Sequence, residues 1–139
     1  MILLELMELY NIADSNNVKV DCFELENQPC LSIQDDEYNC YIAIDPMQLD
    51  SEQQEKEHLA HELGHCCTGA FYSRYSPLSN RGQMEYRATL WQIKKLIPKN
   101  EFEEAIKSGI IELWELAEHF EVSEDLMKKA INYYMQYAG

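Results

Sequence analysis

Three histidines and two cysteines lie within the stretch HLAHELGHCC, which runs from His58 to Cys67. Both residue types bind zinc and similar metal ions in proteins. His61 and His65 are four residues apart, so on a helix their rings lie about 40° apart around the axis and one turn along it. The two rings can therefore bind one metal ion together.

Glu62 directly follows the first histidine of this pair and lies about 100° farther around the helix. This direction suits a carboxylate that reaches water on a bound metal rather than the metal itself. The arrangement is the HExxH pattern of zinc peptidases, in which the metal lowers the pKa of water and the glutamate takes its proton. The alternative is that two histidines fall four residues apart on a solvated helix, where Glu62 is one of many surface acids.

The residues around the pattern favour the metal site. Leu59, Ala60 and Leu63 are apolar, as expected for a helix that packs against a core. Gly64 lies inside the predicted helix, where glycine costs about 1 kcal/mol relative to alanine. We therefore expect another backbone element to approach the helix closely at Gly64.

The remaining potential ligands of this stretch fit the site less well. His58 would spread the ligands over about two helical turns, so we predict a surface residue or a neighbour of the ligands. Cys66 and Cys67 are adjacent and diverge by about 100° on a helix, so they cannot readily share one ion. We expect both cysteines to be small buried side chains.

A catalytic zinc needs a third protein ligand and an open position for water. The candidates are the downstream acids and His119. Glu85 is the most suitable, because Ala88 and Thr89 follow it on the same face of a second predicted helix. That small-residue face could pack against Gly64 and direct Glu85 inward. Spacing alone leaves open the alternative that Glu85 is a favourable acid in the first turn of a helix.

The elements that must position these residues predict an α+β fold. The opening MILLELMELY is an amphipathic helix, and three β-prone runs, 18–23, 30–33 and 39–44, predict a small antiparallel sheet. Ser51 and Gln54 have the form of a capping box that begins the HExxH helix. A loop at 68–82 precedes a helix at 84–97 that Pro98 ends. Further helices are expected from a cap at Asn100 to Gly109, at 110–119 and at 123–137.

Length and composition predict one ordinary domain that spans all 139 residues, and the HExxH pattern predicts that this domain is a metallopeptidase. Residues 1–100 would carry the first helix, the sheet, the HExxH helix and the glutamate helix, and residues 101–139 a C-terminal helical subdomain. The net charge of -14 argues against direct binding to nucleic acid and favours a basic protein or peptide partner. Five cysteines without framework spacing, an opening segment too short to span a bilayer and no export signal predict a cytoplasmic protein without disulfides.

HELGH, followed by a loop and MEYRATLWQIKKLIP, resembles the ImmA/IrrE family of metallopeptidases from about Tyr41 to the C-terminus. The family's second motif runs from a glutamate through an alanine and an aromatic residue to a leucine, an apolar residue and a proline. Those places are taken by Glu85, Ala88, Trp91, Leu96, Ile97 and Pro98. Thr89 departs from the asparagine that the family often has there.

The resemblance implies a zincin-like fold and one zinc ion held by His61, His65 and Glu85, with Glu62 as the base. Manganese or iron could take the place of zinc. The most similar family members belong to phages and integrative mobile elements. They cleave, or promote cleavage of, the helix-turn-helix repressor that silences the element, so such a repressor is the expected substrate.

Two other functions compete with this one. Residues 116–131 have the pattern of a helix-turn-helix, but Ser123, Glu124 and Asp125 would face the phosphates, which disfavours a DNA-binding regulator. The second competing function is a metal-stabilised anti-repressor, which would bind its partner without hydrolysing it. The presence of Glu62 argues against this function, because a purely structural zinc site does not need a base.

Substrate binding and transition-state stabilisation are less well determined. The outer edge of the strand at 39–44 could hold an extended substrate by main-chain hydrogen bonds. Candidates to stabilise the oxyanion are Tyr72, Tyr75, Tyr86 and Arg87, and nothing in the sequence selects one of them.

Overall fold

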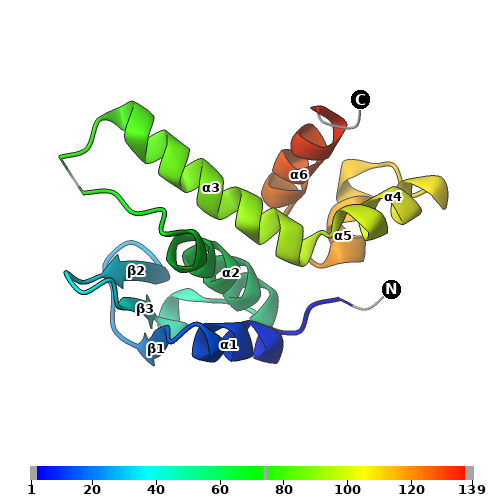
Figure 1. Ribbon diagram of the computed structural model, residues 1–139. Coiled ribbons are helices and arrows are strands. Elements are labelled where there is room, and N and C mark those ends of the chain that lie inside the picture. The colour runs from blue at the N-terminus through cyan, green and yellow to red at the C-terminus, as the bar shows by residue number, and fades with distance from the viewer. Residues whose placement is uncertain (1–2, 74, 137–139) are drawn as a thin grey trace. The chain divides into compact units, whose positions relative to one another are not determined.

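The computed structural model describes residues 3–73 and 75–136. It confirms the α+β class (Figure 1). In chain order the elements are α1 (Leu6–Ser15), β1 (Lys19–Cys22), β2 (Cys30–Gln34), β3 (Cys40–Ile44), the 3₁₀ turn η1 (Pro46–Gln48), α2 (Glu52–Thr68), α3 (Leu78–Leu96), α4 (Lys99–Lys107), α5 (Leu113–Phe120) and α6 (Glu124–Gln136). The contacts divide the chain into two compact units, Leu4–Gln92 and the part from Ile93 onward. None of the described helices is long and apolar enough to cross a membrane.

The three strands form one sheet in the order β1-β3-β2. β2 and β3 pair antiparallel as predicted, but β1 and β3 are parallel, so the prediction of a purely antiparallel sheet is wrong. The segment between β1 and β2 crosses the end of β3, where buried Asp45 accepts a hydrogen bond from the backbone N–H of Leu25. This crossing places β1 and β2 on opposite sides of β3, and nothing in the local sequence indicates it.

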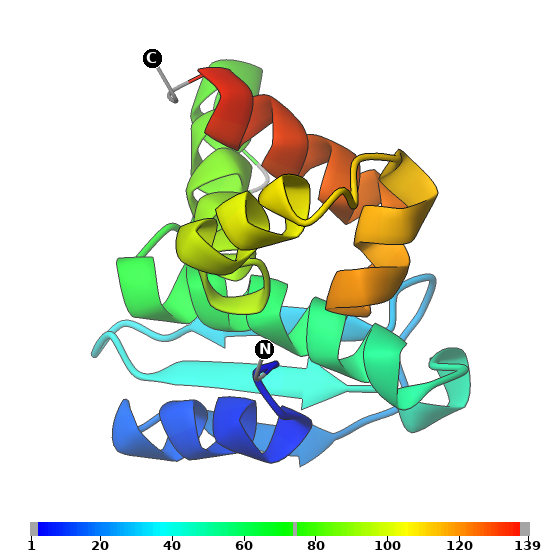
Figure 2. The same ribbon diagram turned by 90° about the vertical axis from the view of Figure 1, so that its right-hand side faces the viewer.

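α1 and α2 cover the same face of the sheet (Figure 2). In the register of the sheet, Ser32 of β2 and Val20 of β1 both lie beside Ile42 of β3. Ile42 is buried, together with Leu59 and Leu63 of α2. Ser32 of β2 therefore lies on the face of the sheet that meets the helix carrying the HExxH pattern.

α2 begins as predicted, because the Ser51 hydroxyl accepts a hydrogen bond from the Gln54 N–H at 3.2 Å. The Gln54 side chain accepts from the N–H of Asp50 rather than that of Ser51, so the capping box is displaced by one residue. The helix ends at Thr68, and Gly69 takes a left-handed conformation with φ of 67°. Glycine adopts this conformation without strain, and it turns the chain back toward the last turn of the helix.

Several helix limits differ from those predicted. α3 starts at Leu78 rather than 84, so the preceding loop is shorter, and it ends before Pro98 as expected. α4 begins directly after Pro98, which takes the cap position without a side-chain hydrogen bond, so the predicted cap at Asn100 is wrong. Proline favours the start of a helix because its fixed φ suits the first turn. In the second unit, Phe102, Phe120, Met127 and Tyr134 are buried.

Cys40 of β3 and Cys66 of α2 form a disulfide, with their Cα atoms 6.0 Å apart. The prediction of a protein without disulfides is therefore wrong. Cys66 and Cys67 are also half-buried rather than buried. The pairing arises because Cys40 lies on the helix-covered face of the sheet, where α2 packs, and a separation of 26 residues gives no local signal of that contact.

Candidate metal centre

α2 and α3 bring three potential metal ligands together. His61 Nε2 lies 3.1 Å from Glu85 Oε1, and His65 Nε2 lies 2.8 Å from Glu85 Oε2. The three ligand atoms fall within 4.8 Å of one another. Two imidazole nitrogens and a carboxylate oxygen around one point can hold a divalent metal ion.

Close packing at Gly64 brings the two helices together. A Cβ atom at this position would lie 2.5 Å from the carbonyl oxygen of Ala88 and 2.9 Å from its Cα. The predicted close approach to Gly64 is therefore confirmed, and Ala88 of α3 makes it. Glu85 lies one turn before Ala88 on α3, so the contact that requires glycine also places the carboxylate beside the two histidines.

The ring of each histidine is held through its Nδ1 atom. His65 Nδ1 bonds to the backbone carbonyl of Ala70, which the left-handed glycine at the end of α2 turns toward the ring. His61 Nδ1 lies 3.3 Å from the side-chain oxygen of Gln92. Both rings consequently present Nε2 to Glu85, which is the orientation that shared metal binding needs.

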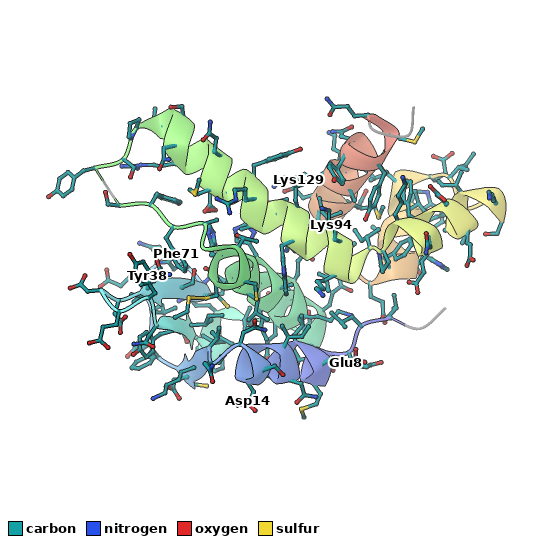
Figure 3. The ribbon with its side chains drawn as sticks, viewed as in Figure 1. Glu8, Asp14, Tyr38, Phe71, Lys94 and Lys129 are labelled. Atoms are coloured by element: carbon teal, nitrogen blue, oxygen red, sulfur yellow. A yellow bond between two sulfur atoms is a disulfide. The ribbon has the colours of Figure 1, made fainter. Side chains whose placement is uncertain are left out.

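An aromatic ring also covers His65. Phe71, labelled in Figure 3, follows α2 and lies with its ring centroid 5.9 Å from that of His65. His65 is only 6% exposed, so the carbonyl of Ala70 and the ring of Phe71 together restrict its movement.

Glu62 lies beside this cluster and outside it. The Ser32 hydroxyl donates a 2.6 Å hydrogen bond to Glu62 Oε1. Glu62, His65, Tyr72 and Glu85 line one cavity of about 230 Å³. A small molecule in this cavity would therefore be in reach of Glu62 and next to two of the potential ligands, His65 and Glu85.

Tyr72 is the one of the four proposed oxyanion-stabilising residues that is found among the described residues lining this cavity. Burial, the negative charge of Glu85 and a hydrogen bond to it raise the pKa of the Tyr72 hydroxyl. The phenol therefore remains protonated and can donate a hydrogen bond. Arg87 instead donates to the backbone carbonyl of Thr68 at 2.7 Å and ties α3 to the end of α2.

Four other histidines and cysteines considered from the sequence, His58, Cys66, Cys67 and His119, are not members of the cluster found among the described residues. His58 is exposed, as predicted. Cys66 is bonded to Cys40. Cys67 does not belong to the cluster of potential ligands that the described residues form. His119 belongs to α5 in the second unit, where its ring contacts Phe120.

Sequence reasoning missed two residues of the site, Ser32 and Gln92. Gln92 could have been found, because it follows Glu85 by seven residues and shares its helix face with Ala88. Ser32 is the only polar side chain in the run CLSI, but its direction depends on the register of β2 against β3.

A family model described as the IrrE N-terminal-like domain, a peptidase family, matches residues 17–132. The match begins well before Tyr41, so the likeness includes the whole sheet. A search of curated proteins finds no match to the chain. The family model covers most of the chain, and the cluster of His61, His65 and Glu85 could hold a metal ion. The chain therefore belongs to the ImmA/IrrE family of IrrE N-terminal-like domains, a family that points to a metallopeptidase.

Proposed function

We propose that the protein is a zinc-dependent endopeptidase with a zincin-like HExxH helix, and that it cleaves the helix-turn-helix repressor of a phage or integrative mobile element. The observation that carries the proposal is the position of Glu62, which shares a cavity with His65 and Glu85 and is not part of the ligand cluster. A purely structural metal site needs no free carboxylate beside an open cavity.

His61, His65 and Glu85 would hold the metal. When bound, the metal would act as a Lewis acid on the scissile carbonyl and lower the pKa of water. Glu62 takes a proton from the attacking water and later delivers it to the leaving amine. The hydrogen bond from Ser32 fixes one oxygen of Glu62 and leaves the other for this transfer. Tyr72, whose single O–H is hydrogen-bonded to Glu85 in this structure, would transfer that hydrogen bond to the oxyanion that forms from the carbonyl.

The edge of β2 is the proposed binding place for the substrate backbone. The earlier expectation that the strand at 39–44 offers its outer edge is wrong, because β3 is central and paired on both sides. Among the described residues, β2 pairs with β3 on one side and with no strand on the other. Cys30, Leu31 and Ser32 of β2 line the cavity that contains Glu62. An extended peptide can add to such an edge by main-chain hydrogen bonds.

Charge supports a basic substrate. The chain has 25 acidic and 11 basic residues, which gives a net charge of -14. A repressor that binds DNA carries basic surface for its contacts with phosphates. Opposite charges raise the rate at which two proteins meet, so an acidic peptidase is suited to a DNA-binding substrate.

The experiment is co-expression of the candidate repressor encoded beside the gene with wild-type protein or with Glu62→Gln. Repressor length is followed on a gel, and transcription of the silenced genes is followed in parallel. Glu62→Gln should keep its metal and fold but lower cleavage by roughly 10² to 10⁴-fold, the usual effect of losing a general base. Glu52→Gln makes the same charge change in the exposed first turn of α2 and should cleave normally.

Two results would contradict the peptidase proposal. Derepression by Glu62→Gln while the repressor remains at full length would instead support an anti-repressor that acts by binding. Loss of metal from Glu62→Gln would place this carboxylate among the ligands and remove the proposed base.

A further inference from the structure

We propose that Gln92 is a positioning residue of the metal centre, which sets the orientation and the tautomer of His61. The proposal rests on the metal site of the proposed function. It starts from the burial of Gln92, whose side chain is 5% exposed and bridges two groups on α2.

The direction of the Gln92 amide follows from its first partner. Its Nε2 donates a 2.8 Å hydrogen bond to the backbone carbonyl of Glu57. If the amide were reversed, its oxygen would face that carbonyl, and two acceptors would oppose each other in a buried place. The oxygen of the amide must therefore face His61.

The second partner then has a defined proton. The Gln92 oxygen only accepts hydrogen bonds, so the Nδ1 atom of His61, 3.3 Å away, must carry the hydrogen. In the neutral ring, Nε2 is then the nitrogen that is left to bind a metal, and it lies on the side of the ring that faces Glu85. Gln92 thus selects the tautomer in which His61 can bind a metal.

The two histidines differ in how they are held. His65 depends on the backbone carbonyl of Ala70, which no side-chain substitution removes directly. His61 depends on one side chain, supplied by α3 seven residues after Glu85. One face of α3 therefore supplies a ligand at Glu85, the close contact at Ala88 and the positioning residue at Gln92.

The test measures the dissociation constant of zinc by competition with a chromophoric chelator. Gln92→Leu keeps a similar volume and removes the acceptor, and we expect the constant to rise by roughly 10 to 100-fold, as is usual when a partner of a metal-binding histidine is lost. Gln92→Glu keeps an acceptor facing Nδ1 but loses the donor to the Glu57 carbonyl, so it should bind zinc more tightly than Gln92→Leu while it unfolds at a lower urea concentration than the wild-type protein. Unfolding in urea, measured on each variant, separates loss of affinity from loss of fold.

Gln48→Leu is the matched control. Gln48 also bridges a backbone carbonyl and a second group, through 2.8 Å bonds to Leu25 and Asp45, in the turn after β3. Its replacement should lower stability without changing zinc affinity.

A spectroscopic measurement on the wild-type protein keeps the proposal testable if Gln92→Leu does not fold. In the zinc-loaded protein, nitrogen NMR of the His61 ring should show a hydrogen on Nδ1 that exchanges slowly with water. A His61 Nδ1 hydrogen that exchanges rapidly with water, an unchanged zinc affinity in Gln92→Leu, or equal affinities of the leucine and glutamate variants would each overturn the role of Gln92. Absence of zinc binding by the wild-type protein would overturn the proposed function as well, so the two failures are distinguishable.

Discussion

Substitution of Gly64 by alanine tests how far the metal centre depends on the contact between α2 and α3. The added Cβ would lie 2.5 Å from the Ala88 carbonyl oxygen, about 0.9 Å short of the 3.4 Å at which ordinary contact begins. Because the obstacle is backbone, α3 must move away from α2 by a similar distance. Overpacking of this kind costs roughly 1 to 3 kcal/mol, and the better helix propensity of alanine returns about 1 kcal/mol.

The net loss in the free energy of unfolding is therefore small, about 0 to 2 kcal/mol. The effect on the site is larger, because Glu85 moves with α3 while both histidines stay on α2. A displacement of about 1 Å in a functional group can cost on the order of 10²-fold in function. We expect Gly64→Ala to remain folded and to bind zinc roughly 10 to 100-fold more weakly.

Chelator competition measures the affinity, and urea unfolding measures the stability. Gly82→Ala is the control, since Gly82 also lies inside a helix, α3, and its Cβ would meet nothing within 4 Å. That variant should gain up to about 1 kcal/mol of stability and keep its zinc affinity. Wild-type affinity in Gly64→Ala would refute the reasoning that the close contact places Glu85.

Three further changes test the site and the fold. Glu85→Gln should weaken zinc binding by more than the roughly 10 to 100-fold that is usual when a neighbour of a ligand is lost. Glu112→Gln is the control and should bind zinc normally. Unchanged metal content in Glu85→Gln would show that another residue is the third ligand. The Cys40–Cys66 disulfide joins residues that are 26 apart. Its reduction should lower the free energy of unfolding by about 3 kcal/mol and leave zinc bound. Equal urea midpoints before and after reduction would argue against the cross-link. Hydrogen bonds from Gln48 and from the N–H groups of Leu25 and Met47 hold the pKa of Asp45 below its ordinary value, so its contribution to stability is present at neutral pH and is lost as the pH falls below about 4. Urea unfolding of Asp45→Asn should show less dependence on pH over that range than the wild-type protein, and an identical dependence would contradict this assignment.

The HExxH helix could be predicted because its signals are local. The cap at Ser51 satisfies a backbone N–H three residues away, and the four-residue spacing of His61 and His65 follows from helical geometry alone. Gly64 also indicated a contact outside its own helix, since a glycine inside a helix implied the close approach of another backbone element. The sequence also indicated the neighbour, because small residues follow Glu85 on one helix face.

Other features depended on which segments meet in three dimensions. The parallel pairing of β1 with β3 follows from a crossing stabilised by Asp45, and the disulfide follows from the packing of α2 on β3. The register of β2 decided that Ser32 faces Glu62, because a shift of one residue would turn it to the opposite face of the sheet.

The sequence by itself therefore determined the helix that carries His61, Glu62 and His65, because spacing along a helix is a property of neighbouring residues, and it left Glu85 as the favoured candidate beside them. Only the tertiary structure decided which groups hold His61 and Glu62 in place. The amide of Gln92 meets His61 across 31 residues, and the hydroxyl of Ser32 meets Glu62 across 30. Such contacts depend on how whole helices and strands pack together, and the spacing of residues within one helix or strand does not reveal that packing.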